Sequence, residues 1–497
     1  MNKIKIAGIT LLFLGVIACD LKEEPYGFYS EENFYQTEGD ANAAVDYAYD
    51  ALTYLEYSRS IFFLGDLPTE ETFPKNDEGI DVQNLDKWQV STFNNNNILT
   101  NFFKYAYIAI NRSNAILENI PDADYEEEFQ NQILGEAYFL RAWNYFNLVR
   151  AFGNVPIHEG LVETLDQTGA PLSENLDQVY DLIIADCQKA IELLEVNQRL
   201  GRADQVAAQA LLSKVYLQIA SAKDHNVSLY NEMNKNVGEM YDLAAETALE
   251  VLEGQAIYGF EDDLLNIYDV EMPLGRENIF LLSMDRSGDI EGDYSKISKL
   301  FIPYIDGATI YLQNPNGSYT PSHDGWSVFN TPTDFYNGFE DADLRKNLLI
   351  VDTVYNSQGE VSATYPGAIP YPFSRKYVDP NFIGDKTSVK PFLLRFSDIA
   401  LVYAEASGPT AKSYEYVNYI RNRAGLGNLE PGLGIQEFRT AILEERKWEL
   451  AWEGNRLYDL RRFNILNETV AEASGLSSDE VNFYPLPQRE IDLNPNL

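Results

Sequence analysis

Apolar residues recur at helical spacing along most of the chain up to residue 254. This pattern predicts amphipathic helices over residues 39–57, 101–119, 125–152, 177–195, 203–220 and 241–252. The stretch 125–152 carries apolar residues on two faces, which predicts a helix packed between two neighbours. Within 203–220, the run Leu212-Ser213-x-x-Tyr216 has the spacing found in the first helix of a tetratricopeptide repeat. Insertions such as 221–240 break the regular period of that repeat, so we predict a mainly α protein with degenerate, tetratricopeptide-like helix pairs.

The pattern changes between residues 255 and 394. Ten of the 21 prolines lie in this block, and it carries no long helical period. The runs at 278–284 and 348–354 predict short strands. Helical periodicity returns at 395–406, 411–424 and 435–464, and the segment 483–487 is predicted to be extended. The pattern therefore predicts a loop-rich, short-strand insertion in a helical protein.

The first residues have the features of a secretory signal. Lys3 and Lys5 precede an apolar run, 6–18, that is too short to span a bilayer, which takes ~20 residues. The sequence Val16-Ile17-Ala18-Cys19 resembles a bacterial lipoprotein cleavage site. We predict that 1–18 is removed, that Cys19 is lipidated, and that 19–30 is a polar tether. The alternative is an ordinary signal peptide with a chance cysteine.

Charge and cysteine content exclude several classes of protein. The chain carries 37 Lys+Arg and 77 Asp+Glu, a formal charge of −40, which repels nucleic-acid phosphates and excludes a nucleic-acid partner. Three His and two Cys leave no cluster for a structural zinc site and no disulfide framework. Cys187 lies on the apolar stripe of a predicted helix, so we interpret it as a core residue.

Five segments together resemble the SusD/RagB family of outer-membrane nutrient-binding lipoproteins. They are 136–157 (EAYFLRAWNYFNLVRAFGNVPI), 201–217 (GRADQVAAQALLSKVYL), 395–406 (RFSDIALVYAEA), 441–463 (AILEERKWELAWEGNRLYDLRRF) and 483–497 (FYPLPQREIDLNPNL). Their order and spacing extend over nearly the whole mature chain. The acidic run Lys22-Glu23-Glu24 after Cys19 is similar to the surface-export signal of such lipoproteins.

The resemblance implies a single SusD-like domain over 31–497. Its helical scaffold, 31–254 and 395–497, would hold four tetratricopeptide-like helix pairs, and the block 255–394 would form the variable ligand face. The family implies a lipid-anchored protein of the outer membrane that faces the cell exterior. Such a protein captures an oligosaccharide or polysaccharide and passes it to a SusC-like TonB-dependent transporter. No catalysis, cofactor or metal is implied.

Aromatic residues in loops are the candidate ligand-binding residues. Sugar rings stack on flat aromatic faces, and planar polar side chains bind hydroxyl groups. Two tryptophans lie in predicted loops, each with aromatic or amide neighbours. The candidates are Trp326, Trp88, Tyr319, Tyr311, Phe93 and Asn96. The alternative is a set of aromatic clusters that only pin the loops.

Other functions remain as alternatives at this point. The alternating run Asp285-x-Ser287-x-Asp289-x-Glu291-x-Asp293 resembles half of a calcium loop. It lacks the glycine at position six of an EF-hand and the acidic ligand at position twelve, where Lys296 stands, which favours a solvated acidic loop over a calcium site. Glu445, Glu449 and Glu453 share one helix face, which favours structural ion pairs over a hydrolytic pair of carboxylates. Binding of peptides or another nutrient, and remotely a glycoside hydrolase, are the alternative functions.

The overall negative charge slightly favours a neutral glycan such as a glucan. The block 255–394 nevertheless holds enough basic residues for a local basic patch, which leaves an anionic ligand open. These residues are Arg276, Lys296, Lys299, Arg345, Lys346, Arg375, Lys376, Lys386 and Lys390.

Overall fold

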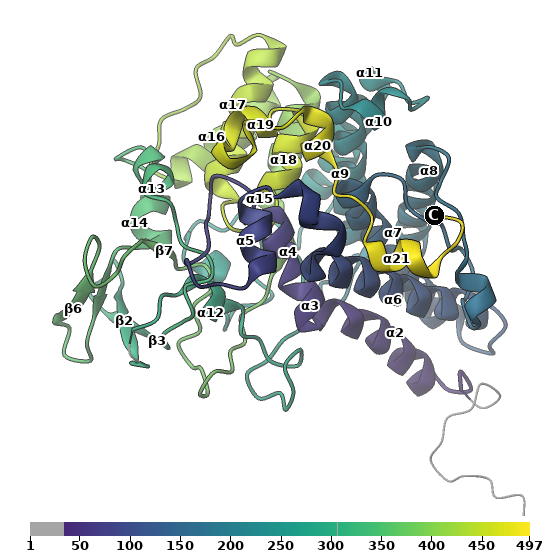
Figure 1. The fold of residues 1–497 in the computed structure, drawn as a ribbon, viewed down its shortest axis with the longest axis horizontal. Coiled ribbons are helices and arrows are strands. Elements are labelled where there is room, and N and C mark those ends of the chain that lie inside the picture. The colour runs from purple at the N-terminus through teal and green to yellow at the C-terminus, as the bar shows by residue number, and fades with distance from the viewer. Residues whose placement is uncertain (1–33, 306) are drawn as a thin grey trace, which may run out of the picture.

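A computed structural model describes residues 34–305 and 307–497 (Figure 1). The predicted signal peptide 1–18, the predicted lipidation site Cys19 and the whole predicted tether 19–30 lie outside the described residues, as do residues 31–33 of the predicted domain. Element labels follow Figure 1 and begin at α2. In the part of the chain described, no helix has the length and apolar character needed to cross a membrane.

Long helices form the scaffold, from α2 to α11 on the right of Figure 1 and from α15 to α17 in its centre and upper part. They are α2 (Glu38–Thr53), α6 (Asn97–Asn119), α7 (Glu127–Phe152), α8 (Leu176–Leu193), α9 (Gln205–Asp224), α11 (Val237–Glu253), α15 (Phe396–Ser407), α16 (Ala411–Arg423) and α17 (Ile435–Glu449). Each of the first eight packs on the next in chain order, so α2/α6, α7/α8, α9/α11 and α15/α16 form four successive pairs. The predicted mainly α fold with paired helices is confirmed.

Short helices connect these elements. They are α3 (Leu55–Ser58), α4 (Ser60–Gly65), α5 (Ile80–Asp86), α10 (Ser228–Asn231), α12 (Ile297–Phe301), α13 (Thr333–Gly338), α14 (Leu344–Leu349), α18 (Arg456–Arg462), α19 (Leu466–Thr469), α20 (Ser478–Asn482) and α21 (Gln488–Leu493).

Side-chain caps fix where several scaffold helices begin. Asn96 accepts hydrogen bonds from the backbone N–H groups of Ile98 and Leu99 at the start of α6. Asn175 and Asp204 accept a backbone N–H in the same way at the starts of α8 and α9. Such caps satisfy amides that have no partner inside the helix, and each stabilises it by ~1 kcal/mol.

The predicted continuous helix 435–464 is wrong, because the chain breaks between α17 and α18. Trp452 and Gly454 have φ of 62° and 76°. The amide of Trp452 donates to a carboxylate oxygen of Glu71 at 3.0 Å, and that of Gly454 donates to Asp66 at 2.8 Å. These buried carboxyl groups belong to the segment after α4. They accept hydrogen bonds from backbone amides that would have bonded within the helix if it had continued.

The strands are short, and those labelled in Figure 1 (β2, β3, β6 and β7) lie in the loop-rich block at its left. They are β1 (Asn278–Leu281), β2 (Ile310–Gln313), β3 (Tyr319–Ser322), β4 (Ile350–Val351), β5 (Thr353–Tyr355), β6 (Val361–Thr364), β7 (Phe373–Ser374) and β8 (Phe392–Arg395). The largest sheet has the order β3-β2-β5-β6, and β1/β8 and β4/β7 form two-stranded ladders. The β1/β8 pair joins the start of the block to the strand that leads into α15.

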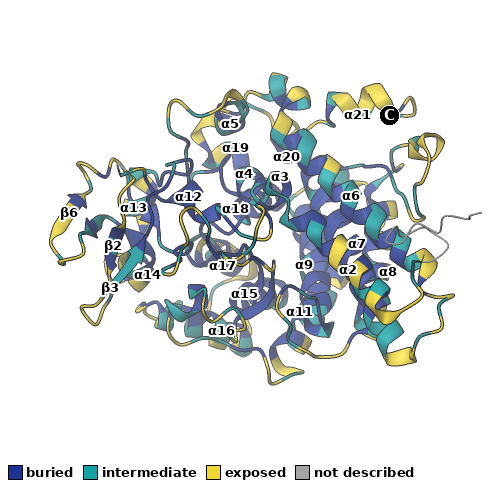
Figure 2. Cartoon of the chain, turned by 90° about the horizontal axis from the view of Figure 1, so that it is seen from below, coloured by how far each residue is buried: buried dark blue, intermediate teal, exposed yellow. Residues whose placement is uncertain are grey.

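Two cores lie under these elements. The main core runs through the scaffold helices, which are dark blue inside in Figure 2, and it contains Cys187, whose exposed fraction is 0%. The core position predicted for that cysteine is confirmed. A second, smaller core lies against one face of the four-stranded sheet and includes Ile310, Leu312 and Val354.

Candidate functional site

The free face of the four-stranded sheet carries a row of aromatic side chains. Tyr311 pairs with Pro321 on β3 and with Tyr355 on β5, and Gln313 pairs with Tyr319. Directly paired residues, and residues two apart on one strand, share a face of a sheet. All five therefore lie on the face opposite the small core, and we call them the tyrosine face.

The tyrosine face offers rings and hydroxyl groups at the surface. Its three tyrosines are half-buried and belong to neither core. The Tyr319 and Tyr355 rings lie 5.1 Å apart at 59°, and the Tyr355 hydroxyl donates to the Gln313 side chain at 3.1 Å. The Tyr311 hydroxyl has no hydrogen-bond partner among the described residues. Flat rings beside polar groups are the arrangement that stacks on and orients a sugar.

Trp326 lies in the loop that follows β3, half-buried against the main core. Its ring is bordered by two cations: the Arg59 guanidinium carbon is 5.4 Å from the ring centroid and the Lys299 ammonium is 5.6 Å from it. The Trp326 amide donates to the Lys299 carbonyl at 2.7 Å, which ties the loop to α12. Trp326 thus keeps part of its ring at the surface, in a setting of positive charge.

The structure contradicts the prediction that Trp88, Phe93 and Asn96 contact a ligand. Their exposed fractions are 3%, 1% and 1%. Trp88 stacks on Tyr484 at 6.2 Å and Phe93 meets the same ring at 5.4 Å. The Trp88 indole N–H donates to the Pro68 carbonyl at 3.0 Å, and Asn96 caps α6.

These residues therefore have structural roles. Tyr484 belongs to the extended segment near the C-terminus, and its amide bonds to the end of α7. Trp88 and Phe93 pack on Tyr484 and so hold this segment on the scaffold. For these residues the alternative stated above applies: they form an aromatic cluster that fixes a loop.

The acidic loop 285–293 makes internal and ion-pair contacts. Asp285 accepts from the Ser287 amide at 2.9 Å, and Glu291 forms ion pairs with Arg59 and Lys296. In the part of the chain that the structure describes, no group of three or more His, Cys, Asp or Glu side chains could hold a metal ion. The loop is thus held in place by hydrogen bonds within it and by ion pairs with Arg59 and Lys296.

Glu445 and Glu449 on α17, and Glu453 in the break after that helix, are buried and paired. Arg345 contacts Glu445 at 2.7 Å and Glu449 at 3.3 Å, and Arg395 contacts Glu453 at 2.8 Å. Burial alone would raise the pKa of Glu449, but the surrounding arginines outweigh it and lower that pKa to about 2. These carboxylates stabilise the scaffold as predicted, and they do not face a cleft as a hydrolytic pair would.

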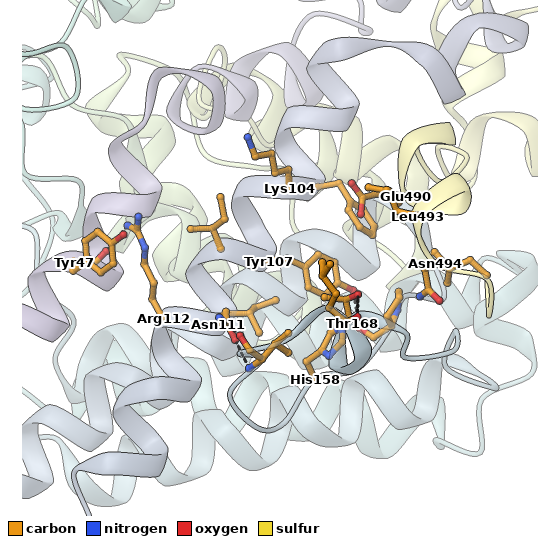
Figure 3. A pocket seen from close by; sticks show the side chains of 17 residues that line it. Tyr47, Lys104, Tyr107, Asn111, Arg112, His158, Thr168, Glu490, Leu493 and Asn494 are labelled. Atoms are coloured by element: carbon orange, nitrogen blue, oxygen red, sulfur yellow. Dashed lines mark hydrogen bonds between the residues drawn. The ribbon is translucent and has the colours of Figure 1, made fainter. Parts of the chain in front are cut away.

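A cavity of about 820 Å³ opens on the helical scaffold between α6, α21 and the segment 156–168 (Figure 3). Apolar and aromatic side chains line most of it. Asn111 and the Tyr107 hydroxyl bond to backbone groups of 156–162 and fix one wall. Leu165 and Leu493 stand at its edge with exposed fractions of 89% and 66%. The cavity is far from the tyrosine face, since β2 and β3 lie at the opposite end of the molecule from α6 and α21 in both Figure 1 and Figure 2.

Two stretches of the chain match known families. Residues 37–217 match the family described as "Starch-binding associating with outer membrane", and residues 326–497 match the one described as "SusD family". Together the two matches cover well over half of the chain. The chain belongs to the SusD family. This is a family of carbohydrate-binding, non-catalytic proteins, so the protein is a binding protein and not an enzyme.

Curated SusD-family relatives align over the full length. SusD-like protein P2 of Formosa agariphila is 28% identical, with 100% of this chain and 99% of the relative covered. SusD-like protein P38 of the same organism is 27% identical with the same coverage.

Solved structures share the SusD fold. A structure described as "Laminarin binding SusD-like protein" has a TM-score of 0.75 and 23% identity, covering 93% of this chain and 98% of that chain. Surface glycan-binding protein A from Bacteroides thetaiotaomicron, in complex with laminarihexaose, has a TM-score of 0.69 and 20% identity, covering 91% and 97%. At this identity the likeness shows the fold.

Sequence reasoning missed several residues of this SusD-family surface. Tyr355 lies one residue beyond the predicted strand 348–354. Because successive residues of a strand point to opposite faces, a buried Val354 indicates that Tyr355 lies on the other face of the sheet. Tyr304, in the loop after α12, has an exposed fraction of 65%. Arg59 lies beside Trp326 but comes from a segment far away in the sequence, so no local pattern could have identified it.

Proposed function

We propose that the protein binds a glycan on the loop-rich face, with the tyrosine face as its stacking surface. The observation that carries this proposal is the alignment of Tyr311, Tyr319 and Tyr355 on one exposed face of a sheet. Membership of a carbohydrate-binding family supports it, as do the relatives of the same fold whose descriptions name laminarin and laminarihexaose.

Calorimetry and affinity electrophoresis against a panel of polysaccharides test this proposal. We expect binding without release of reducing ends. Tyr319→Ala and Tyr311→Ala should each weaken it, since stacking of one aromatic ring contributes ~0.5–1.5 kcal/mol. Tyr47→Ala is the matched control, because Tyr47 is an exposed tyrosine on α2 at the opposite end of the molecule. Binding of peptides alone, or of no glycan in the panel, would refute the proposal.

We further propose that the protein is a surface lipoprotein that serves a SusC-like TonB-dependent transporter. The sequence Val16-Ile17-Ala18-Cys19 supports lipid anchoring, and the family description supports association with the outer membrane. Several acyl chains on one cysteine suffice for stable anchoring, at ~0.8 kcal/mol per buried CH₂ group. Cys19→Ala should move the protein from the membrane fraction to the soluble fraction; retention in the membrane would refute the anchor.

The cavity on the helical scaffold is the surface that we assign to the transporter. Exposed apolar side chains around a concave site are typical of protein contacts, and the cavity lies away from the tyrosine face. Leu165→Asp combined with Leu493→Asp should abolish co-purification with the transporter and leave glycan binding unchanged. Unchanged co-purification would refute this assignment.

A further inference from the structure

A group of cations and aromatic rings surrounds Trp326, and it draws on four separate segments of the chain. Arg59 and Lys299 border the Trp326 ring at 5.4 and 5.6 Å. Lys386 and Lys296 border the half-buried ring of Tyr294 in the same way, at 4.8 and 5.8 Å.

Two carboxylates join the two rings into one surface. Glu291 forms ion pairs with both Arg59 and Lys296. Asp385 pairs with Lys299 at 2.6 Å and is adjacent to Lys386 in the chain. We call this set of residues the cation–aromatic cluster: Arg59, Glu291, Tyr294, Lys296, Lys299, Trp326, Asp385 and Lys386.

The cations of the cluster outnumber the carboxylates that pair with them. Four basic side chains share two carboxylates, in a chain where acidic residues outnumber basic ones by 77 to 37. Lys386 has no carboxylate partner among the described residues; its ammonium donates to the Gly288 carbonyl at 2.6 Å. The pKa of Asp385 is lowered, mainly by the hydrogen bond from Lys299 and to a smaller extent by the charges of Lys299 and Lys296. Within the cluster the basic side chains therefore exceed the carboxylates by two, and the Glu56 carboxylate also acts on Arg59 from outside it.

A purely structural role does not require this surplus. The buried Arg345, by comparison, contacts three acids, Asp343, Glu445 and Glu449. The cluster instead lies at the surface, with side-chain exposed fractions of 18% for Arg59 and 22% for Lys296. The partly exposed Lys296 and Lys386 thus retain ammonium donors that a ligand can reach, whereas Lys299 is buried, with a side-chain exposed fraction of 8%.

We propose that the cation–aromatic cluster binds the anionic groups of an acidic polysaccharide, either uronate carboxylates or sulfate esters. This inference rests on the proposed glycan-binding function and names the class of glycan. A pyranose ring that lies on Trp326 or Tyr294 brings its substituents next to an ammonium group. A charged acceptor there forms charge-assisted hydrogen bonds, which are stronger than those of neutral hydroxyl groups. The local surplus of cations therefore overrides the preference for a neutral glycan that the total charge suggests.

The test compares acidic and neutral polysaccharides on the same protein. Affinity electrophoresis and calorimetry would use polygalacturonate and alginate as polyuronates, carrageenan and chondroitin sulfate as sulfated chains, and laminarin and starch as neutral chains. We expect binding of at least one acidic chain, tighter than that of either neutral chain. It should weaken as the ionic strength rises above about 0.1 M, where the Debye length is ~10 Å.

Matched lysine variants assign the binding to the cluster. Lys386→Gln should weaken binding of the acidic chain about tenfold, because a hydrogen bond to a charged group is lost. Lys346→Gln is the control: the Lys346 ammonium also borders a tyrosine ring, at 4.9 Å from Tyr336, but it lies outside the cluster. The double variant Lys296→Gln/Lys386→Gln should bind more weakly still, and thermal unfolding of each variant verifies that it is folded.

Each outcome decides between the two proposals. Binding of neutral chains alone overturns the acidic-glycan inference and leaves the proposed function standing. Equal affinity of the acidic chain for the Lys386→Gln, double and Lys346→Gln proteins also overturns the inference. Binding of no polysaccharide from either class refutes the proposed function itself. Binding restricted to the polyuronates or to the sulfated chains supports the inference and identifies the anionic group.

Discussion

Replacing Glu449 by glutamine tests whether the buried ion network stabilises the scaffold. The Glu449 side chain is 1% exposed and accepts from Arg423 at 2.8 Å and from Arg395 and Arg345 at 3.3 Å. These arginines come from α16, from the end of β8 and from α14, so one carboxylate compensates charge from three elements. Glutamine keeps the shape of the side chain and removes its charge.

The magnitude follows from the pKa of this carboxyl group. Glu449 has a pKa of about 2 in the folded protein against an ordinary value of 4.5. A tenfold change in acid dissociation corresponds to ~1.4 kcal/mol, so the ionised carboxylate contributes about 3 kcal/mol to stability at neutral pH. Removal of one partner from a buried ion pair costs ~3–5 kcal/mol, which agrees in size.

Denaturant unfolding at pH 7 measures this loss. Glu444→Gln is the matched control on the same helix, since Glu444 is 56% exposed and only 3.8 Å from Lys447. We expect the control to change the free energy of unfolding by less than ~0.5 kcal/mol. A loss below about 1 kcal/mol in Glu449→Gln, or one equal to the control, would refute the reasoning.

The pH dependence gives an independent check. The pKa of Glu449 is lower in the folded protein than in the unfolded chain, so its contribution is complete above pH 4.5. It is lost as the pH falls from 4.5 towards 2. The difference in stability between the wild type and Glu449→Gln should therefore shrink over that range. A difference that stays constant from pH 7 to the acid limit would show that glutamine acts through packing and not through charge.

Three other predictions follow from groups outside this network. Burial raises the pKa of Glu71 to about 8, so the free energy of unfolding should fall as the pH rises from 4.5 to 8. In denaturant titrations over this range, Glu71→Gln should make that fall smaller, and an equal pH dependence of the two proteins would contradict the prediction. Gly454→Ala should cost about 2–4 kcal/mol, because φ is 76° and a Cβ atom would lie 2.6 Å from a neighbouring side chain, whereas Gly427→Ala, with open space around it, should be near neutral in the same measurement. Arg375→Ala should weaken glycan binding at the tyrosine face several-fold with little loss in thermal stability, and unchanged calorimetric affinity would disprove this link.

Local periodicity was enough to predict the scaffold. The helices predicted at 101–119 and 411–424 agree with α6 and α16 to within a few residues, because their burial follows a single helix face. The break after α17 could not be predicted in this way. It depends on Asp66 and Glu71, which are remote in the sequence and reach Trp452 and Gly454 only in the folded protein.

The candidate site was predictable only in part, for a similar reason. Trp326 lies in a loop as predicted, whereas Tyr311 and Tyr319 lie on strands β2 and β3, and all three are half-buried at the surface of the loop-rich block. Trp88 also lies outside the long helices, yet it is buried, because its partner Tyr484 comes from the other end of the chain. A loop position indicates an exposed ring only when no distant segment covers it.

Two consecutive residues connect the tyrosine face to the scaffold. Lys376, just after β7, donates to the carbonyl groups of Glu449 and Ala451 at 3.0 Å and to the Glu453 carboxylate at 2.7 Å, so it belongs to the buried ion network. Arg375 points to the tyrosine-bearing hairpin, where it donates to the Gln313 carbonyl at 2.9 Å. The hairpin is therefore held by a backbone segment that is itself anchored in the most buried part of the molecule. A surface ordered in advance loses little conformational entropy when a ligand binds. In the proposed function this connection would therefore help the half-buried tyrosines to contribute to affinity. In the proposed function the ion network would thus act on binding through geometry alone, because none of its carboxylates lies on the tyrosine face.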